Sequence, residues 1–186
     1  MGYPFFLASL PDIRPGAAPA WTSARFLEEA ARNLSAPDFA VLAALASDAS
    51  CGHPFVRAWR SFDTQLRNAC ARARAARRGL DAKPFLRPHE ECDGALDRRV
   101  QAVFQSAPDP FAREQALDAL RLERLASLPE DPFSLDAVLA YYLRLRIAER
   151  IAAPDPEAGR ARLRSVVAGA TTDAENEGPR TDSTTL

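Results

Sequence analysis

The alternation of apolar and polar positions predicts helices over most of the chain. Apolar residues recur every three or four positions, the repeat of an amphipathic helix, in seven segments. These segments begin near residues 22, 35, 54, 90, 109, 134 and 155, and the last ends near residue 168. Residues 3–10 form an apolar run too short for periodicity to separate a strand from a buried helix. We therefore expect an all-α fold, an irregular bundle of six to seven helices, with a short strand as one option at the N-terminus.

Local signals place several helix ends. Ser35 is a suitable N-cap, Pro37 fits the first turn, and Asp38 follows the cap by three residues. Gly79 is a good C-terminal cap for the longest predicted helix, residues 54–78. The dipeptide Pro-Phe occurs five times, with prolines at positions 4, 54, 84, 110 and 132. Proline is pre-set for a first helical turn, so we interpret the dipeptide as a helix start whose phenylalanine folds back onto the core.

The longest predicted helix carries two stripes of different character. One stripe is apolar and should face the core: Phe55, Trp59, Phe62, Leu66, Ala69, Cys70 and Ala73. The other stripe, which we call the arginine face, lies about 130° away around the helix and consists of Arg57, Arg60, Arg67, Arg74 and Arg78. Residues 51–90 contain nine basic residues and three acidic ones, so the positive charge is concentrated here.

The last 17 residues differ from the rest of the chain. Residues 170–186 contain one aliphatic side chain, Leu186, no aromatic side chain, four acids and one base. Such a segment buries too little apolar surface to offset the entropy lost on ordering. We expect a helical domain over residues 1–169 and a disordered acidic tail over residues 170–186.

Composition and charge narrow the function classes. The chain of 186 residues suits one domain with a tail, and its net charge of -1 gives no general argument for nucleic-acid binding. No apolar run is long enough for a membrane span, and no positive charge precedes the apolar N-terminal run, as a signal peptide would require. Three cysteines without a C-x-x-C pair suit a reducing, cytoplasmic compartment.

Motifs for enzyme chemistry are weak. The glycines build neither a phosphate-binding loop nor a dinucleotide fingerprint. Cys51, His53, His89 and Cys92 suit zinc by residue type, but the predicted helix between the two pairs is about 37 Å long. A return loop of ten residues spans at most about 35 Å, and the spacing matches no common zinc module. We find no nucleophile, base and orienting residue in one pattern. We therefore expect no catalytic, metal or cofactor-binding residues.

The arginine face has three interpretations. It is either a solvated side of a long helix, a docking surface for an acidic protein partner, or an RNA-binding surface. RNA binding is the weakest of these, because no aromatic side chains interleave the arginines to stack on bases. The five arginines of this face are therefore our candidate partner-docking residues.

Several apolar motifs are shared with a known family. They are Tyr3 to Pro11 (Y-P-F-F-L-A-S-L-P), Phe26-Leu27, Leu34-Ser35-x-x-Asp38, Phe55-x-x-x-Trp59, Glu114-x-x-Leu117-Asp118-x-Leu120-Arg121, and Phe133-x-Leu135-x-x-x-Leu139-x-Tyr141-x-Leu143. On these motifs residues 3–168 resemble a bacterial family of unknown function whose genes lie among those of V/A-type rotary ATPases. The chain is also similar to the C subunit of these ATPases, a longer, all-helical, non-catalytic adaptor between the central stalk and the membrane rotor ring.

The resemblance implies a function without supplying functional residues. It implies a non-catalytic subunit or accessory factor of a V/A-type proton- or sodium-translocating ATPase, acting as an adaptor between subunits. Its partners would be other V/A-type ATPase subunits, and it would lie in the cytoplasm or peripherally on the cytoplasmic face of the inner membrane. The alternative is a free-standing cytosolic protein-interaction module unrelated to the ATPase.

Overall fold

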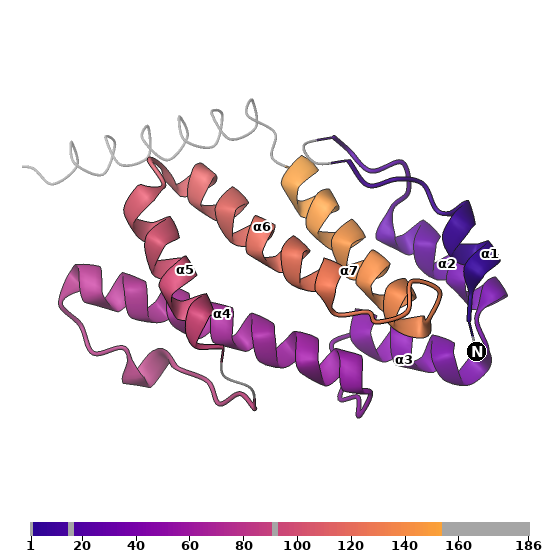
Figure 1. Cartoon of the computed structure of the whole chain (residues 1–186), viewed down its shortest axis with the longest axis horizontal. Coiled ribbons are helices and arrows are strands. Elements are labelled where there is room, and N and C mark those ends of the chain that lie inside the picture. The colour runs from indigo at the N-terminus through magenta and orange to yellow at the C-terminus, as the bar shows by residue number, and fades with distance from the viewer. Residues whose placement is uncertain (1, 15–16, 91–92, 154–186) are drawn as a thin grey trace, which may run out of the picture. The chain divides into compact units, whose positions relative to one another are not determined.

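A computed structural model describes residues 2–14, 17–90 and 93–153 (Figure 1). Within those ranges the fold is all-α, as predicted, with seven α-helices and no strand. The helices are α1 (Pro4–Ser9), α2 (Ser23–Asn33), α3 (Ala36–Ala46), α4 (Pro54–Arg78), α5 (Gly94–Ser106), α6 (Pro110–Ser127) and α7 (Leu135–Ala152), with a short 3-10 turn, η1 (Lys83–Phe85). The predicted helix over residues 155–168 and the predicted tail over residues 170–186 lie outside the described residues.

The apolar N-terminal run is a helix, so the option of a short strand is wrong. Pro4 occupies the first turn of α1, where its missing N–H costs no hydrogen bond. Tyr3 and Phe6, three residues apart, are buried together on the core side. The backbone N–H of Tyr3 donates to the carbonyl of Phe133 at 2.6 Å, which ties the start of the chain to the loop before α7.

The predicted capping residues are confirmed. The Ser35 hydroxyl accepts a hydrogen bond from the backbone N–H of Asp38 at 3.4 Å and caps α3. Gly79 ends α4 in the left-handed conformation, with φ of 66°, and its N–H donates to the last turn of the helix. Glycine reaches this conformation without the steric penalty that a Cβ would impose, so α4 ends here.

The Pro-Phe prediction is correct for most helix starts and wrong for four of the five phenylalanines. Proline begins α1, η1, α4 and α6 at or next to the first position, whereas Pro132 lies in the turn before α7. Only Phe55 packs into the core, while the other four are exposed: Phe5, Phe85, Phe111 and Phe133. The first turn of a helix places side chains around its whole circumference, so proline sets the backbone but not the direction of the next side chain.

The core forms along a series of neighbouring helices. Helix α4 packs on α5, α5 on α6, α6 on α7, and α7 on both α2 and α3. In Figure 1, α4 runs along one side of the bundle and α7 lies between α6 and α2. The apolar stripe of α4 is buried as predicted, with Ala73 only partly buried, and the rings of Trp59 and Phe62 lie 5.9 Å apart.

A second aromatic group joins the N-terminal helices to α7. The Phe26 ring lies 5.8 Å from Phe6, 5.3 Å from Tyr141 and 5.8 Å from Tyr142. Among the described helices, none is both long and apolar enough to cross a lipid bilayer.

Candidate binding surface along helix α4

Three of the five predicted docking arginines are bound to other parts of the protein. Arg60 reaches back to the preceding loop, where its guanidinium donates to the carbonyl of Ala49 at 2.7 Å and lies 3.5 Å from the Asp48 carboxylate. Its side chain is only 30% exposed. Arg60 therefore binds the loop before α4 and is only partly exposed on the arginine face.

Arg67 and Arg74 are also paired, yet both side chains remain exposed. Arg67 lies 2.7 Å from the Asp63 carboxylate one turn earlier on α4, with 65% of its side chain exposed. Arg74 lies 3.7 Å from Glu114 on α6, with 58% exposed. Exposed pairs of this kind are worth about 0–1 kcal/mol, so they leave both guanidiniums available to a partner.

Arg57 and Arg78 are the two members of the arginine face without an ion pair in the described part of the chain. Both are exposed on the surface. The arginine face is one stripe along the sequence of α4. In the structure its C-terminal end, with Arg74 and Arg78, lies beside α5 and α6.

Arginines on α6 and α7 form an inner ion network with two aspartates, one of which, Asp63, also pairs with Arg67 of the arginine face. Asp118 is 4% exposed and accepts hydrogen bonds from Arg121 at 2.9 Å and from Arg150. Arg121 also donates to Asp63 at 3.0 Å. Burial opposes the charge of Arg121, but the two aspartates outweigh it and raise the pKa of its guanidinium. These charges are satisfied internally and join α4, α6 and α7.

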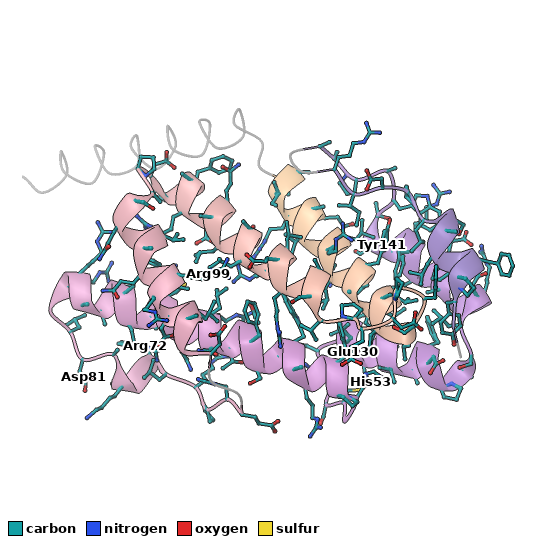
Figure 2. All side chains as sticks on the ribbon, in the orientation of Figure 1. His53, Arg72, Asp81, Arg99, Glu130 and Tyr141 are labelled. Carbon is teal, nitrogen blue, oxygen red and sulfur yellow. The ribbon has the colours of Figure 1, made fainter. Side chains whose placement is uncertain are left out.

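Two further arginines make structural ion pairs across helix boundaries, and Figure 2 labels both. Arg72 on α4 makes a two-oxygen contact with Asp97 on α5, at 2.6 and 2.8 Å. Arg99 on α5 pairs with Glu123 on α6, with one contact of 3.0 Å. Both pairs are accessible to water, so they orient the helices more than they stabilise them.

A pocket of about 450 Å³ lies at the C-terminal end of α4. It is lined by Arg74, Arg77 and Arg78 from α4, Phe104 from α5 and Arg113 from α6. We call this the arginine pocket. The sequence pattern identified Arg74 and Arg78 but missed Arg77, which is off the stripe, and Arg113, which lies on another helix.

Phe104 holds two of these arginines in place. The guanidinium carbon of Arg113 lies 4.8 Å from the centre of the Phe104 ring, and that of Arg74 lies 5.8 Å from it. Arginine stacks well on an aromatic ring because its planar cation is weakly hydrated. The Nε atom of Arg113 is buried and has no hydrogen-bond partner in the described structure. The stacked ring therefore supports Arg113 without neutralising its charge.

The residues considered for zinc have other surroundings. Figure 2 labels His53, which is the N-cap of α4. Its Nδ1 atom lies 3.9 Å from the carboxylate of Asp136, whose pKa is raised by burial despite the opposing effect of His53. No cluster of three metal-ligating side chains occurs within residues 2–14, 17–90 and 93–153. Cys92 lies outside these ranges, so the four-residue zinc hypothesis gains no support here.

No known protein family matches this chain, and neither the curated proteins nor the solved structures contain a significantly similar protein.

Proposed function

We propose that this chain is a non-catalytic helical adaptor that binds an acidic protein surface through the arginine face of α4. The observation that carries the proposal is the excess of exposed arginine on this helix. Arg57, Arg67 and Arg78 are exposed. Asp63, the acid on the same helix, has only 15% of its side chain exposed and also pairs with Arg121. A coherent positive surface attracts acidic partners and speeds their association.

The partner proposed on sequence grounds is a subunit of a V/A-type rotary ATPase. This assignment is supported by the family resemblance of the apolar motifs. Two of those motifs pack together: Tyr3 donates to the carbonyl of Phe133, and the Tyr141 hydroxyl donates to the carbonyl of Pro11 at 2.7 Å. The adaptor acts as a rigid helical body, without ATP hydrolysis of its own, in the cytoplasm or at the cytoplasmic membrane face. The alternative remains a free-standing interaction module.

The test combines charge reversal with a salt series. The variant Arg57→Glu/Arg67→Glu reverses two exposed charges that lie outside the arginine pocket. Binding to purified V/A-type ATPase from the source organism is measured by surface-based kinetics at several salt concentrations. We expect wild-type binding to weaken with salt, and the variant to bind at least about tenfold more weakly, chiefly through slower association.

The matched control is Arg14→Glu/Arg98→Glu, which changes the net charge equally on other exposed parts of the chain. It should bind as the wild type does. Thermal unfolding of each variant verifies that it folds. The ATPase assignment fails if the wild type does not bind the ATPase at low salt. Salt-independent binding that survives the double reversal would overturn the role of the arginine face, whereas salt-dependent binding to a different, defined acidic protein would favour the free-standing module.

A further inference from the structure

The arginine pocket has a composition that packing does not explain. Arg77 and Arg78 lie in the last turn of α4, where positive charge compensates the partial negative charge of the helix end. That effect does not account for Arg113, which comes from the first turn of α6, where the helix end is partially positive. Two helix ends of opposite polarity thus contribute arginines to one cavity.

The pocket is short of negative charge. Its lining contains four guanidiniums. Glu114, 3.7 Å from Arg74, makes the one ion pair found for them in the described structure. Asp109, near the same helix start, already accepts from the backbone N–H of Ala112 at 2.8 Å as the N-cap of α6. Like charges held close together repel each other, so the cavity favours an anion that neutralises them.

The shape and fixed parts of the pocket indicate a small ligand. A volume of about 450 Å³ falls in the range of small-molecule sites, about 300–1,000 Å³. Because Phe104 orders Arg74 and Arg113 beforehand, less side-chain entropy remains to be lost on binding. Phe104 is itself 8% exposed and covered by guanidiniums, so it offers no open face for stacking a nucleobase.

We propose that the arginine pocket binds a compact polyphosphate, recognised through its phosphate oxygens and not through an attached base. Guanidinium groups match phosphate oxygens with paired, charge-assisted hydrogen bonds, and several linked phosphates suit several converging arginines. This site goes beyond the proposed adaptor function, because it concerns a small anion and uses two arginines, Arg77 and Arg113, that are not part of the arginine face.

The direct test is calorimetric titration of the full chain with sodium tripolyphosphate at constant ionic strength. The pocket variant is Arg77→Gln/Arg113→Gln, and the control is Arg14→Gln/Arg98→Gln, which removes two exposed charges outside both the pocket and the arginine face. We expect the wild type and the control to bind alike, and the pocket variant to bind at least about tenfold more weakly. Absence of wild-type binding, or equal weakening of both variants, would overturn the proposal.

Three further measurements make the result specific. Unfolding curves without ligand verify that the pocket variant folds. The variant Arg113→Lys keeps the positive charge but loses the paired N–H donors of the guanidinium, so it should bind tripolyphosphate with intermediate affinity. ATP should bind within a few-fold of tripolyphosphate, because no base contact is expected; much tighter ATP binding would contradict recognition through phosphates alone. An oligoglutamate peptide of equal charge should bind more weakly. Equal binding of this peptide, lost in the pocket variant, would instead make the pocket part of the acidic-partner surface and overturn the polyphosphate assignment.

Because the docking test changes Arg57 and Arg67, outside this pocket, the two proposals fail separately. If both proposals hold, the variant Arg57→Glu/Arg67→Glu binds the ATPase more weakly and still binds tripolyphosphate as the wild type does.

Discussion

The inner ion network and the arginine pocket are both rich in arginine, but they differ in what surrounds the charge. In the inner network, Asp63 and Asp118 accept hydrogen bonds from Arg121, and both carboxylates are largely buried. In the arginine pocket, four guanidiniums have one carboxylate partner between them among the residues that the structure describes. In the inner network each arginine has a carboxylate partner, whereas most of the pocket arginines have none among the described residues.

The difference shows that the number of arginines does not identify a binding site. What distinguishes the two regions is the position of acids on neighbouring helices. Asp118 lies one helical turn before Arg121 and faces it, whereas the corresponding neighbours of Arg113 are a capping aspartate and a glutamate already paired with Arg74. We therefore assign a structural role to arginines that pair with buried carboxylates, and a binding role to arginines without such a partner. Each role can be tested by substituting one residue of the group.

The largest effect should come from the inner network. Asp118→Ala leaves Arg121 with one of its two carboxylates and removes a buried negative charge that pairs with two arginines. Removing one partner of a buried pair costs about 3–5 kcal/mol, so we expect a loss of this order in urea unfolding. If the free energy of unfolding falls by less than about 1 kcal/mol, water replaces the lost carboxylate beside Arg121. The inner network would then not differ from the arginine pocket in the way described.

A smaller effect should come from the residue that ends α4 beside the pocket. Gly79→Ala should cost about 1–2 kcal/mol, because alanine in the left-handed conformation brings its Cβ near a carbonyl oxygen. Faster amide exchange in the last turn of α4 should accompany the loss. Gly94→Ala is the matched control: an added Cβ also meets open space there, but without a positive φ, so stability should not fall. Equal losses of stability in Gly79→Ala and Gly94→Ala would show that the left-handed conformation at Gly79 is not the cause.

Removing a pocket arginine should affect stability less than either change. Arg113→Ala breaks no ion pair in the described structure and loses the contact with the Phe104 ring, worth about 0.5–1 kcal/mol. Relief of repulsion among the remaining arginines offsets part of that loss. We expect a net change below about 1 kcal/mol by urea unfolding. A loss as large as that of Asp118→Ala would make the pocket a structural site like the inner network.

The smallest effect concerns the thiol pKa of Cys70, which is buried on α4 and is influenced by charges from both regions. Burial raises the pKa of its thiol, while Arg74 of the pocket and Arg121 of the network oppose the rise. Because the folded-state pKa is raised, the thiol contributes stability below the unfolded pKa, and this contribution is lost as the pH rises through the folded value. Arg74→Gln removes one opposing charge and should raise the pKa further.

The measurement is the pH dependence of alkylation by iodoacetamide in a chain whose other cysteines, Cys51 and Cys92, are replaced by serine. Labelling requires the thiolate, so the profile should move to higher pH in Arg74→Gln. The same substitution at the distant Arg14 should leave the profile in place. A shift toward lower pH would show that Arg74 does not act on Cys70 through its charge.

Local signals made much of the fold predictable. The cap at Ser35, the stop at Gly79 and the buried stripe containing Trp59 depend on residues within one helix or its ends, and the structure has all three. The nature of residues 3–10 stayed open, because the burial of Tyr3 and Phe6 depends on distant segments such as the loop at Phe133. Periodicity within a short run contains no such information.

The candidate site was predictable only in part, for the same reason. A helical stripe identified Arg74 and Arg78, but it could not indicate that Glu114 pairs with Arg74 or that Arg113 lines the same pocket. Arg77 had a local signal, since it adjoins Arg78 just before Gly79 at a helix end. Arg113 had none, because its place in the pocket depends on how α5 and α6 return to α4.

The choice of arginine for the pocket also determines which covalent modifications can act on it. The chain contains a single lysine, Lys83, which is not among the pocket residues. The lining therefore offers no lysine amine for acetylation. Lysine acetylation regulates many binding sites by removing positive charge, but the charge of this pocket is not open to that route.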